Sequence, residues 1–475
     1  MKNQILPSAL LLLSMNECLS AATPTSGEVT THTSPNKIEE RCVILDHIPG
    51  GEYSTRDEKT EQAYCSIDLH RNTTALCPRS WSSTPGAVFY LLSAGPYRGK
   101  AGKFEAVACS LGKSAANYTT GKPIEFISSI AMQEASGAFS ASPLLYYHFS
   151  RYFNTHIRVP VAVLRTMDSK VHRQRVTQRG IELAATNKTM NLAAWKKLNE
   201  IQQKPELASA AGELFTEEGQ QISGVMQHSA GMPYGELMNG ASGSDSGVCQ
   251  NPGYQQTPAF QALRSTQPLK KAIREALAEA ANALHIAAET EISDQQMAYW
   301  MQDLTEIALL DHIFNQQGRD GNIAFEEWWY WKKGSTVRKQ FARTKTAPRN
   351  LARHKPGRIM ETYLNDNESG GRVSADNLTR DAGVLSSLRH FNPDTYKQLI
   401  RLDRDFSKKR KLYQYLKQNF ALSEQQFQQI VANTREAAEI LRTNCKEKKL
   451  RFDLRPNRFF ARGSSSAKRL NCNKP

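Results

Sequence analysis

The sequence lacks several features that mark familiar classes of protein. It contains no Cys-x-x-Cys pair, so the cysteine spacing suggests neither a zinc site nor a thiol redox centre. After the first 22 residues no apolar run is long enough to span a membrane, and no internal repeat is visible. Acidic residues number 46 against 61 basic ones, which gives a formal net charge of +15. This excess predicts attraction to anionic partners such as phosphorylated ligands, nucleic acid or an acidic membrane, or else a basic surface that is only solvated.

The first residues have the pattern of an export signal. Ile5 to Met15 form a Leu-rich apolar run, and the small residues at 20–22 offer a cleavage region. The sequence therefore predicts a signal peptide over residues 1–22. We expect a periplasmic or secreted protein without a transmembrane anchor.

The cysteines are typical of an oxidising compartment. Seven follow Cys18, four of them clustered in the N-terminal region. We expect disulfides within that cluster, and a bridge between Cys445 and Cys472 would hold the C-terminal tail. Because seven is an odd number, at least one thiol stays free or pairs between chains.

Length and composition predict two lobes with appendages. A chain of 475 residues with 40% hydrophobic residues is too long for one small domain and apolar enough for a core. The pattern along the chain divides it into a signal peptide, a flexible leader, a β-containing N-lobe, a helical C-lobe and a basic tail. We place these at residues 1–22, 23–60, 61–165, 166–444 and 445–475.

Hydrophobic periodicity predicts the main elements. Strands are expected at 87–92, 104–108 and 157–164, with a helix at 144–153 between the last two. Further helices are expected at 268–291, 294–314, 394–420 and 423–444, the last opened by a capping box of Ser423 and Gln426.

Two short polar turns lie in the region predicted to be helical. The first, within residues 309–323, ends an apolar helix in a stretch rich in Arg, Asp, Gly and Asn. The second, residues 365–371, reads Asn-Asp-Asn-Glu-Ser-Gly-Gly. Phosphoryl transfer needs a residue that orients or deprotonates the acceptor, a Lys on the phosphates, and Asp and Asn groups on the metal. The two turns supply part of that set.

The chain resembles atypical kinases, a group that includes the secretory-pathway kinases, the phosphatidylinositol 4-kinases and the HipA-like kinases. The helix at 144–153 followed by Val159-Pro160 is similar to a helix-then-strand passage of these proteins. The stretch from Asp311 to Asn322 resembles their catalytic loop, and Asp366 stands where their second metal-binding Asp follows. The resemblance covers about half of the chain. It implies an α+β, two-lobed kinase-like fold with a small β-containing N-lobe and a larger, mainly helical C-lobe.

The resemblance also implies ligands and roles. The cofactor would be ATP with Mg²⁺ or Mn²⁺, and the γ-phosphoryl group would pass to a hydroxyl on a protein, lipid or glycan. The residues to which it assigns roles are Asp320 as base with Arg319 beside it, Asn322 and Asp366 as metal ligands, Lys103 as phosphate contact in competition with Lys100 and Lys122, and Glu134 or Glu125 as the acidic partner of that lysine.

One position departs from the pattern of these kinases. Gly318 precedes Arg319 where they carry Asp, and Gly has no group that orients a hydroxyl or accepts its proton. Either Asp320 has taken this role in a shifted loop, or the catalytic carboxylate is missing. Losing a positioned base typically costs ~10²–10⁴ in rate. The alternative is therefore a non-catalytic, pseudokinase-type binding or structural protein of the cell envelope.

Two further interpretations concern the same loop and the tail. Read as a degenerate EF-hand, the loop would start at Gln316 and place Gly318 third, which leaves few anions for Ca²⁺. The aromatic run 328–331 is predicted to be packed core or an exposed platform. The basic, aromatic tail at 445–475 is expected either to contact an anionic surface or to be flexible and solvated.

Overall fold

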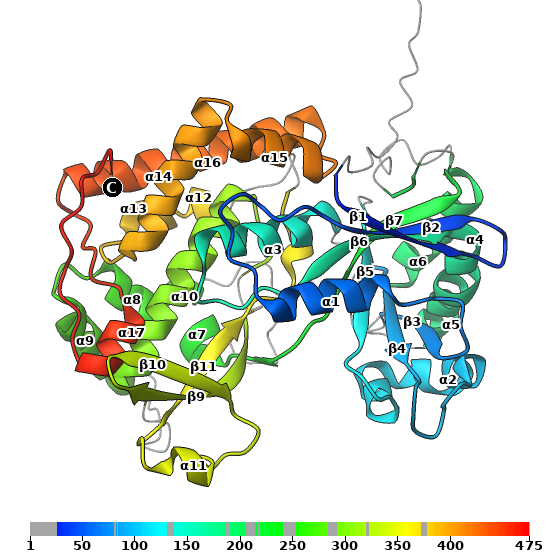
Figure 1. Cartoon of the computed structure of the whole chain (residues 1–475), viewed down its shortest axis with the longest axis horizontal. Coiled ribbons are helices and arrows are strands. Elements are labelled where there is room, and N and C mark those ends of the chain that lie inside the picture. Colours follow the sequence, from blue (N-terminus) through cyan, green and yellow to red (C-terminus); the bar gives the residue numbers. More distant parts are fainter. Residues whose placement is uncertain are drawn as a thin grey trace, which may run out of the picture.

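The computed structural model describes residues 26–79, 82, 84–130, 137–186, 191–205, 214–216, 219–240, 253–283, 292–319, 323–371 and 378–474. They form an N-terminal lobe around an antiparallel sheet and a mainly helical C-terminal lobe (Figure 1). The α+β class and the order of the two lobes are as the sequence predicts. Within the described ranges, no helix combines the length and the apolar character that a membrane span requires. The predicted signal peptide, Cys18 and Cys249 lie outside these ranges.

A seven-stranded antiparallel sheet forms the N-terminal lobe, with the order β1-β2-β6-β7-β5-β4-β3. The strands β4, β5 and β6 are buried along almost their whole length, and β4 is the continuous apolar run that predicts such a strand. The strand expected at 157–164 begins later, at Ala162. The bounds are β1 (Glu28–Thr33), β2 (Glu39–Ile44), β3 (Thr74–Pro78), β4 (Ala87–Leu91), β5 (Ile124–Ser128), β6 (Ala162–Asp168) and β7 (Gln221–Gln227).

The expectation of a flexible leader over 23–60 is wrong for its central part. β1 pairs with β2 over six residues, and β2 pairs with β6 through Cys42 and Val43. β1 is polar because it is an edge strand whose side chains are mostly exposed. Later in the chain, β7 supplies the central strand of this sheet, so the N-terminal lobe reaches Gln227, beyond the boundary expected at residue 165.

A helix replaces the strand expected at 104–108. α2 (Ala101–Ala108) buries Ala101, Phe104 and Ala108, a spacing of three and then four residues that repeats with the helical period. A window of five residues is too short to distinguish that period from a strand. The other helices around the sheet are α1 (Thr55–Cys65), the 3₁₀ helix η1 (Cys109–Tyr118), α4 (Ser169–His172), the π-helical turn η2 (Arg173–Thr177), α5 (Gln178–Thr186) and α6 (Leu192–Gln203).

The long helix α10 (Asp294–Ile313) forms the centre of the C-terminal lobe and is buried from Gln296 onward. Its position confirms the helix expected at 294–314. α3 (Ala141–Phe153) is likewise buried along almost its whole length and confirms the helix expected at 144–153. The other described helices are α7 (Glu236–Asn239), η5 (Tyr254–Gln256), α8 (Pro258–Arg264), α9 (Leu269–Ala283), α12 (Leu378–Asp381), α13 (Val384–Ser387), α14 (Pro393–Ser407), α15 (Lys411–Asn419), α16 (Glu424–Lys446) and α17 (Pro456–Arg462).

Helix ends follow local chemistry. α16 starts at the predicted capping box, in which Ser423 and Gln426 each bond the other's backbone N–H. The single helix expected at 394–420 is two helices, and the break between them contains Lys409 with a positive φ of 49°. The helix expected at 268–291 is confirmed up to Ala283.

A second, smaller sheet has the order β10-β9-β11, and β8 pairs with the start of β9. Its strands are β8 (Met232–Pro233), β9 (Ala324–Lys333), β10 (Thr336–Phe341) and β11 (Gly357–Tyr363), with α11 (Arg349–Ala352) between the last two. The aromatic run 328–331 lies on β9, where Trp329 and Tyr330 are buried and the other two are half-buried. The core interpretation of this run is therefore largely correct.

Three disulfides lie within the described part of the chain: Cys42–Cys65, Cys77–Cys109 and Cys445–Cys472. The first two lie within the N-terminal cluster, and the third is the bridge that the sequence predicts. The tail is not a loose extension, because it carries α17 and its Cys472 carbonyl accepts a hydrogen bond of 2.7 Å from the Tyr396 hydroxyl.

Candidate functional site

The two polar turns identified in the sequence lie against each other in the structure. The first follows α10, and the second follows β11 and includes the 3₁₀ helix η7 (Asn367–Ser369). The Gln316 amide donates to the Asp366 carbonyl at 3.2 Å, and the Gly371 N–H donates to the Phe314 carbonyl. These bonds hold together segments some fifty residues apart in the chain.

The second turn is also fixed to the segment that leaves the large sheet. The Asn365 amide donates to the Ala230 carbonyl at 2.8 Å, and the Ala230 N–H donates back to the Asn365 side-chain oxygen at 3.2 Å. Asp366 has a left-handed backbone with φ of 53°, a conformation that Asp adopts more readily than most residues. The turn therefore presents the exposed Asp366 side chain, while Asn367 and Glu368, which follow it, are buried.

A buried ion pair supports the turns from within the C-terminal lobe. The Arg319 guanidinium donates to both carboxylate oxygens of Asp311, to the Asn365 carbonyl at 2.6 Å and to the Asn367 side-chain oxygen at 2.8 Å. The Tyr146 hydroxyl of α3 donates to Asp311 at 2.6 Å, and burial followed by the charge of Asp311 raises the pKa of this phenol. Almost all N–H groups of Arg319 are thus engaged, which makes it a residue that positions the turn.

A second buried ion pair joins the N-terminal lobe to the same turn. Arg79, which follows β3, lies 3.3 Å from Glu125 of β5 and 3.0 Å from Glu368. The Ser229 hydroxyl also donates to Glu125, at 2.8 Å. Of the polar atoms in this group, the Arg79 Nε and one Glu368 carboxylate oxygen are buried without a hydrogen-bond partner in the described part of the chain. A charge this deeply buried is stable only when it is paired.

The charges of Glu368 and Arg79 both act on the Asp366 carboxyl. Its buried surroundings and then the negative charge of Glu368 raise its pKa above the usual value, against the opposing charge of Arg79. Because the side chain still reaches solvent, water moderates the rise. A divalent cation between Asp366 and Glu368 would relieve their repulsion, and carboxylate oxygens are the ligands that Mg²⁺ and Mn²⁺ prefer.

The donor set fits such an ion only in part. No group of three or more His, Cys, Asp or Glu side chains suited to a metal occurs among the residues with a described placement. Mg²⁺ commonly binds through one or two protein carboxylates, with water and phosphate oxygens completing its shell. Asp366 and the unpartnered oxygen of Glu368 match that sparse arrangement.

Gly318, the departure noted in the sequence, faces the second turn. A Cβ added at this position would lie 3.6 Å from the Ser369 hydroxyl and 3.8 Å from its Cβ, which are ordinary contacts. Its backbone is outside the left-handed region that favours glycine. A Cβ therefore fits here without strain, on the side that faces Ser369 of the second turn.

The remaining predicted residues are placed as follows. Lys103 is exposed on α2, so it does not begin a strand beside the turns. Glu125 pairs with Arg79 and not with a lysine. The residues Asp320, Asn322 and Glu134 lie outside the described ranges, and their roles stay predictions.

Sequence reasoning missed Arg79 and Glu368. Glu368 belongs to the polar turn that we singled out, so its neighbourhood was visible. Arg79 gave no local signal, because only the pairing of β3 with β4 and the packing of the lobes bring it to Glu368.

The EF-hand interpretation is wrong. An EF-hand needs a second helix after its loop, whereas β9 follows this loop and carries Glu327 in a ladder opposite Met360.

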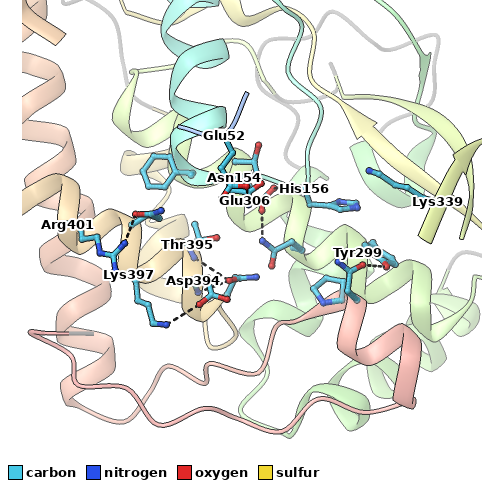
Figure 2. Close-up of a pocket in the computed structure, with 17 residues that line it drawn as sticks. Glu52, Asn154, His156, Tyr299, Glu306, Lys339, Asp394, Thr395, Lys397 and Arg401 are labelled. Atoms are coloured by element: carbon cyan, nitrogen blue, oxygen red, sulfur yellow. Dashed lines mark hydrogen bonds and ion pairs between the residues drawn. The ribbon is translucent and has the colours of Figure 1, made fainter. Parts of the chain in front are cut away.

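A separate polar cavity of about 630 Å³ lies between the end of α3, the middle of α10 and the start of α14 (Figure 2). Here Glu306 accepts the backbone N–H groups of His156 at 2.8 Å and Ile157 at 3.0 Å, and the His156 ring bonds Asp303 at 2.6 Å. Burial and then the charge of Asp303 raise the pKa of Glu306 to about 7. Burial disfavours the charged form of His156, but Asp303 outweighs it and raises the pKa of the ring. This network fixes the segment after α3 to α10.

Comparison with known proteins gives a weak likeness. No protein-family model matches the sequence, and no curated protein matches it. Among solved structures, the crystal structure of the Golgi casein kinase is 11% identical, covers 83% of this chain and 78% of its own, and has a TM-score of 0.38. The same kinase with Mn/ADP bound is 11% identical, covers 82% and 76%, and has a TM-score of 0.37. A likeness of this strength establishes neither activity nor ligands.

Proposed function

We propose that the protein binds a nucleotide and a divalent metal between its lobes, at the junction of the two polar turns. The observation that carries this proposal is the pair of carboxylates Asp366 and Glu368, held beside a buried arginine from the other lobe. Asp366 would hold the metal with Asn322, and Glu368 would add an oxygen. ATP with Mg²⁺ or Mn²⁺ would supply both the transferable phosphoryl group and the remaining metal ligands.

In this proposal Arg79 takes the place that the resemblance gives to a lysine. It lies at the end of a strand in the N-terminal lobe, pairs with Glu125, and keeps its Nε without a partner in the described residues. Lys103, by contrast, is exposed on α2. Arginine binds phosphate oxygens through several fixed N–H donors, which suits the β- and γ-phosphates.

Catalysis is proposed to be weak or absent. Gly318 occupies the position of the expected carboxylate, and Arg319 is engaged in supporting the turn. If the protein transfers phosphoryl groups, Asp320 would be the base and a hydroxyl on a protein, lipid or glycan the acceptor. The second candidate is a pseudokinase-type binding protein that keeps the site for the metal and nucleotide alone. Its compartment would be oxidising, as three disulfides favour, and reached through the signal peptide.

Thermal unfolding with ATP and Mg²⁺ or Mn²⁺ tests binding. Ligand at ~100 times its dissociation constant should add about 2.7 kcal/mol to the free energy of unfolding and raise the melting temperature. Asp366→Ala should abolish this rise because it removes a metal ligand, whereas Glu58→Ala, which removes an exposed carboxylate of α1, should keep it. Absence of any rise with every nucleotide and metal pair would refute the site.

A further inference from the structure

A long stretch of the second sheet carries positive charge only. Residues 328–360, which we call the basic arm, contain ten Lys and Arg residues and no Asp or Glu. The arm comprises the second half of β9, β10, α11 and the first half of β11. All ten of its cationic residues are exposed: Lys332, Lys333, Arg338, Lys339, Arg343, Lys345, Arg349, Arg353, Lys355 and Arg358.

Almost none of this charge is neutralised within the protein. Lys339 pairs with Glu361 at 2.6 Å, and Arg358 lies 3.6 Å from Glu327. The other eight cationic residues form no ion pair with the described part of the chain. The arm therefore presents a concentrated positive field to solvent.

The same sheet exposes apolar side chains. Phe341, at the end of β10, is 41% exposed, and Met232 of β8 is 55% exposed. Phe341 pairs opposite Trp328 and Met232 opposite Phe325, so β10 and β8 follow each other along one edge of β9. Because Trp328 and Phe325 are three residues apart on β9, Phe341 and Met232 lie on opposite faces of the sheet. Trp331, half-buried, stands opposite Arg338 in the ladder. Figure 1 shows β9, β10 and α11 at the lower edge of the molecule, away from the large sheet.

We propose that the basic arm binds the surface of a bilayer that contains anionic phospholipids. The negative surface potential of such a bilayer attracts the cationic side chains of the arm. Exposed aromatic and apolar side chains add binding free energy by entering the headgroup region. A dissolved polyanion such as RNA would also be attracted to these cationic residues. The disulfides, however, indicate an oxidising compartment, where nucleic acid is not the expected partner. The proposal is independent of nucleotide binding.

Vesicle flotation of the purified protein tests the proposal. The probes are vesicles of phosphatidylcholine alone and of phosphatidylcholine with about one third phosphatidylglycerol, at low and high salt. Each Lys or Arg near an anionic membrane strengthens binding by about fivefold. Replacing Lys332, Lys333, Arg343 and Lys345 together by Gln should therefore weaken binding to the anionic vesicles by at least about 100-fold. Phosphatidylcholine alone should bind neither form.

A matched variant separates the arm from net charge. Replacing Lys408, Arg410, Lys411 and Lys446 by Gln removes the same number of exposed charges from the helical lobe and should leave vesicle binding within a few fold. Equal losses in the two variants would overturn the proposal, since binding would then follow net charge. Failure of the unaltered protein to bind anionic vesicles would overturn it as well. So would arm-dependent binding of poly(U) RNA without vesicle binding, which would identify a polyanionic chain as the partner.

Discussion

At the scale of single residues, the site depends on where buried charges find partners. Arg319 and Arg79 are 3% and 5% exposed, and each is held by two acidic or amide groups on either side of the Asp366 turn. Breaking one partner of such a pair typically costs 3–5 kcal/mol, because the other charge stays buried. Substitutions at these arginines would therefore report on folding before they report on chemistry. Gly318 is the more informative position, since its neighbourhood has room.

Gly318→Asp tests whether the rest of the catalytic loop is competent. If Asp320 has not replaced the missing carboxylate, this substitution should raise ATP turnover by up to ~10²–10⁴, because it restores a positioned base. The ordinary contacts with Ser369 mean that the added side chain should not unfold the loop. Turnover of ATP at saturating metal is the measurement.

Gly318→Asn is the matched control, because it has the same size without the carboxylate. Equal activity of the Asn and Asp variants would show that shape and not proton transfer changed the rate. If Asp320 is the working base, Gly318→Asp should help nothing and Asp320→Ala should abolish activity. Robust activity that neither substitution changes would show that the loop is misplaced.

At the scale of elements, α10 connects the two sites described above. Its C-terminal end leads into the first polar turn, and its middle carries the cavity network around Glu306. Glu306 accepts two backbone N–H groups from the segment that leads from α3 to β6. The Glu306 carboxylate thus fixes how these elements meet.

The charge of Glu306 predicts a dependence of stability on pH. Its pKa is about 7 in the folded protein and 4.5 as the ordinary value, so the folded state binds the proton more tightly. Tighter binding of this proton contributes to the free energy of unfolding. The contribution, up to roughly 3 kcal/mol, is complete below pH 4.5 and is lost as pH rises through 7. Glu306→Gln should therefore gain stability relative to the unaltered protein between pH 5 and pH 8.

Denaturant unfolding at those two pH values measures the gain. The charge of His156 opposes the rise in the pKa of Glu306, so the two groups titrate together and the difference between the two proteins reports on both. Gln at 306 still offers one oxygen to the backbone N–H groups. A stability difference that is the same at both pH values would contradict the assignment.

The elements that sequence predicted well are long and have clear ends. α10 and α16 show many helical turns, and the Ser423 capping box marks a start independently of tertiary contacts. The sequence misled in short or polar segments, such as α2 and the edge strand β1, where pairing and packing decide. The two polar turns were recognisable because their side chains are adjacent in sequence. Their buried partner Arg79 was not recognisable, because its role depends on a contact between the two lobes.

At the scale of the whole molecule, the disulfides restrict both ends of the described chain. Cys445–Cys472 closes a loop with a separation of 27 residues that contains α17. By loop-closure entropy such a crosslink contributes about 3.5 kcal/mol. Replacing both cysteines by Ser should lower the free energy of unfolding by that order and expose the tail to limited proteolysis.

Cleavage mapping and denaturant unfolding of this variant provide the measurement. The Cys77–Cys109 bridge stays intact in it and keeps the N-terminal lobe as an internal reference. An unaltered tail-cleavage rate and unaltered stability, with Cys445 and Cys472 found as free thiols in the native protein, would contradict the bridge.

The pairing of β9 with β11 has a consequence for how the molecule can vary. Ala324, just after the first turn, stands directly opposite Tyr363, just before the second, and the ladder continues for seven pairs. The end of this ladder therefore helps to align the two turns, together with the hydrogen bonds that join them. Insertions, deletions or charge changes beyond the ladder, between residues 335 and 356, leave that alignment intact. The basic arm and the junction of the two turns can accordingly diverge independently among descendants of this chain.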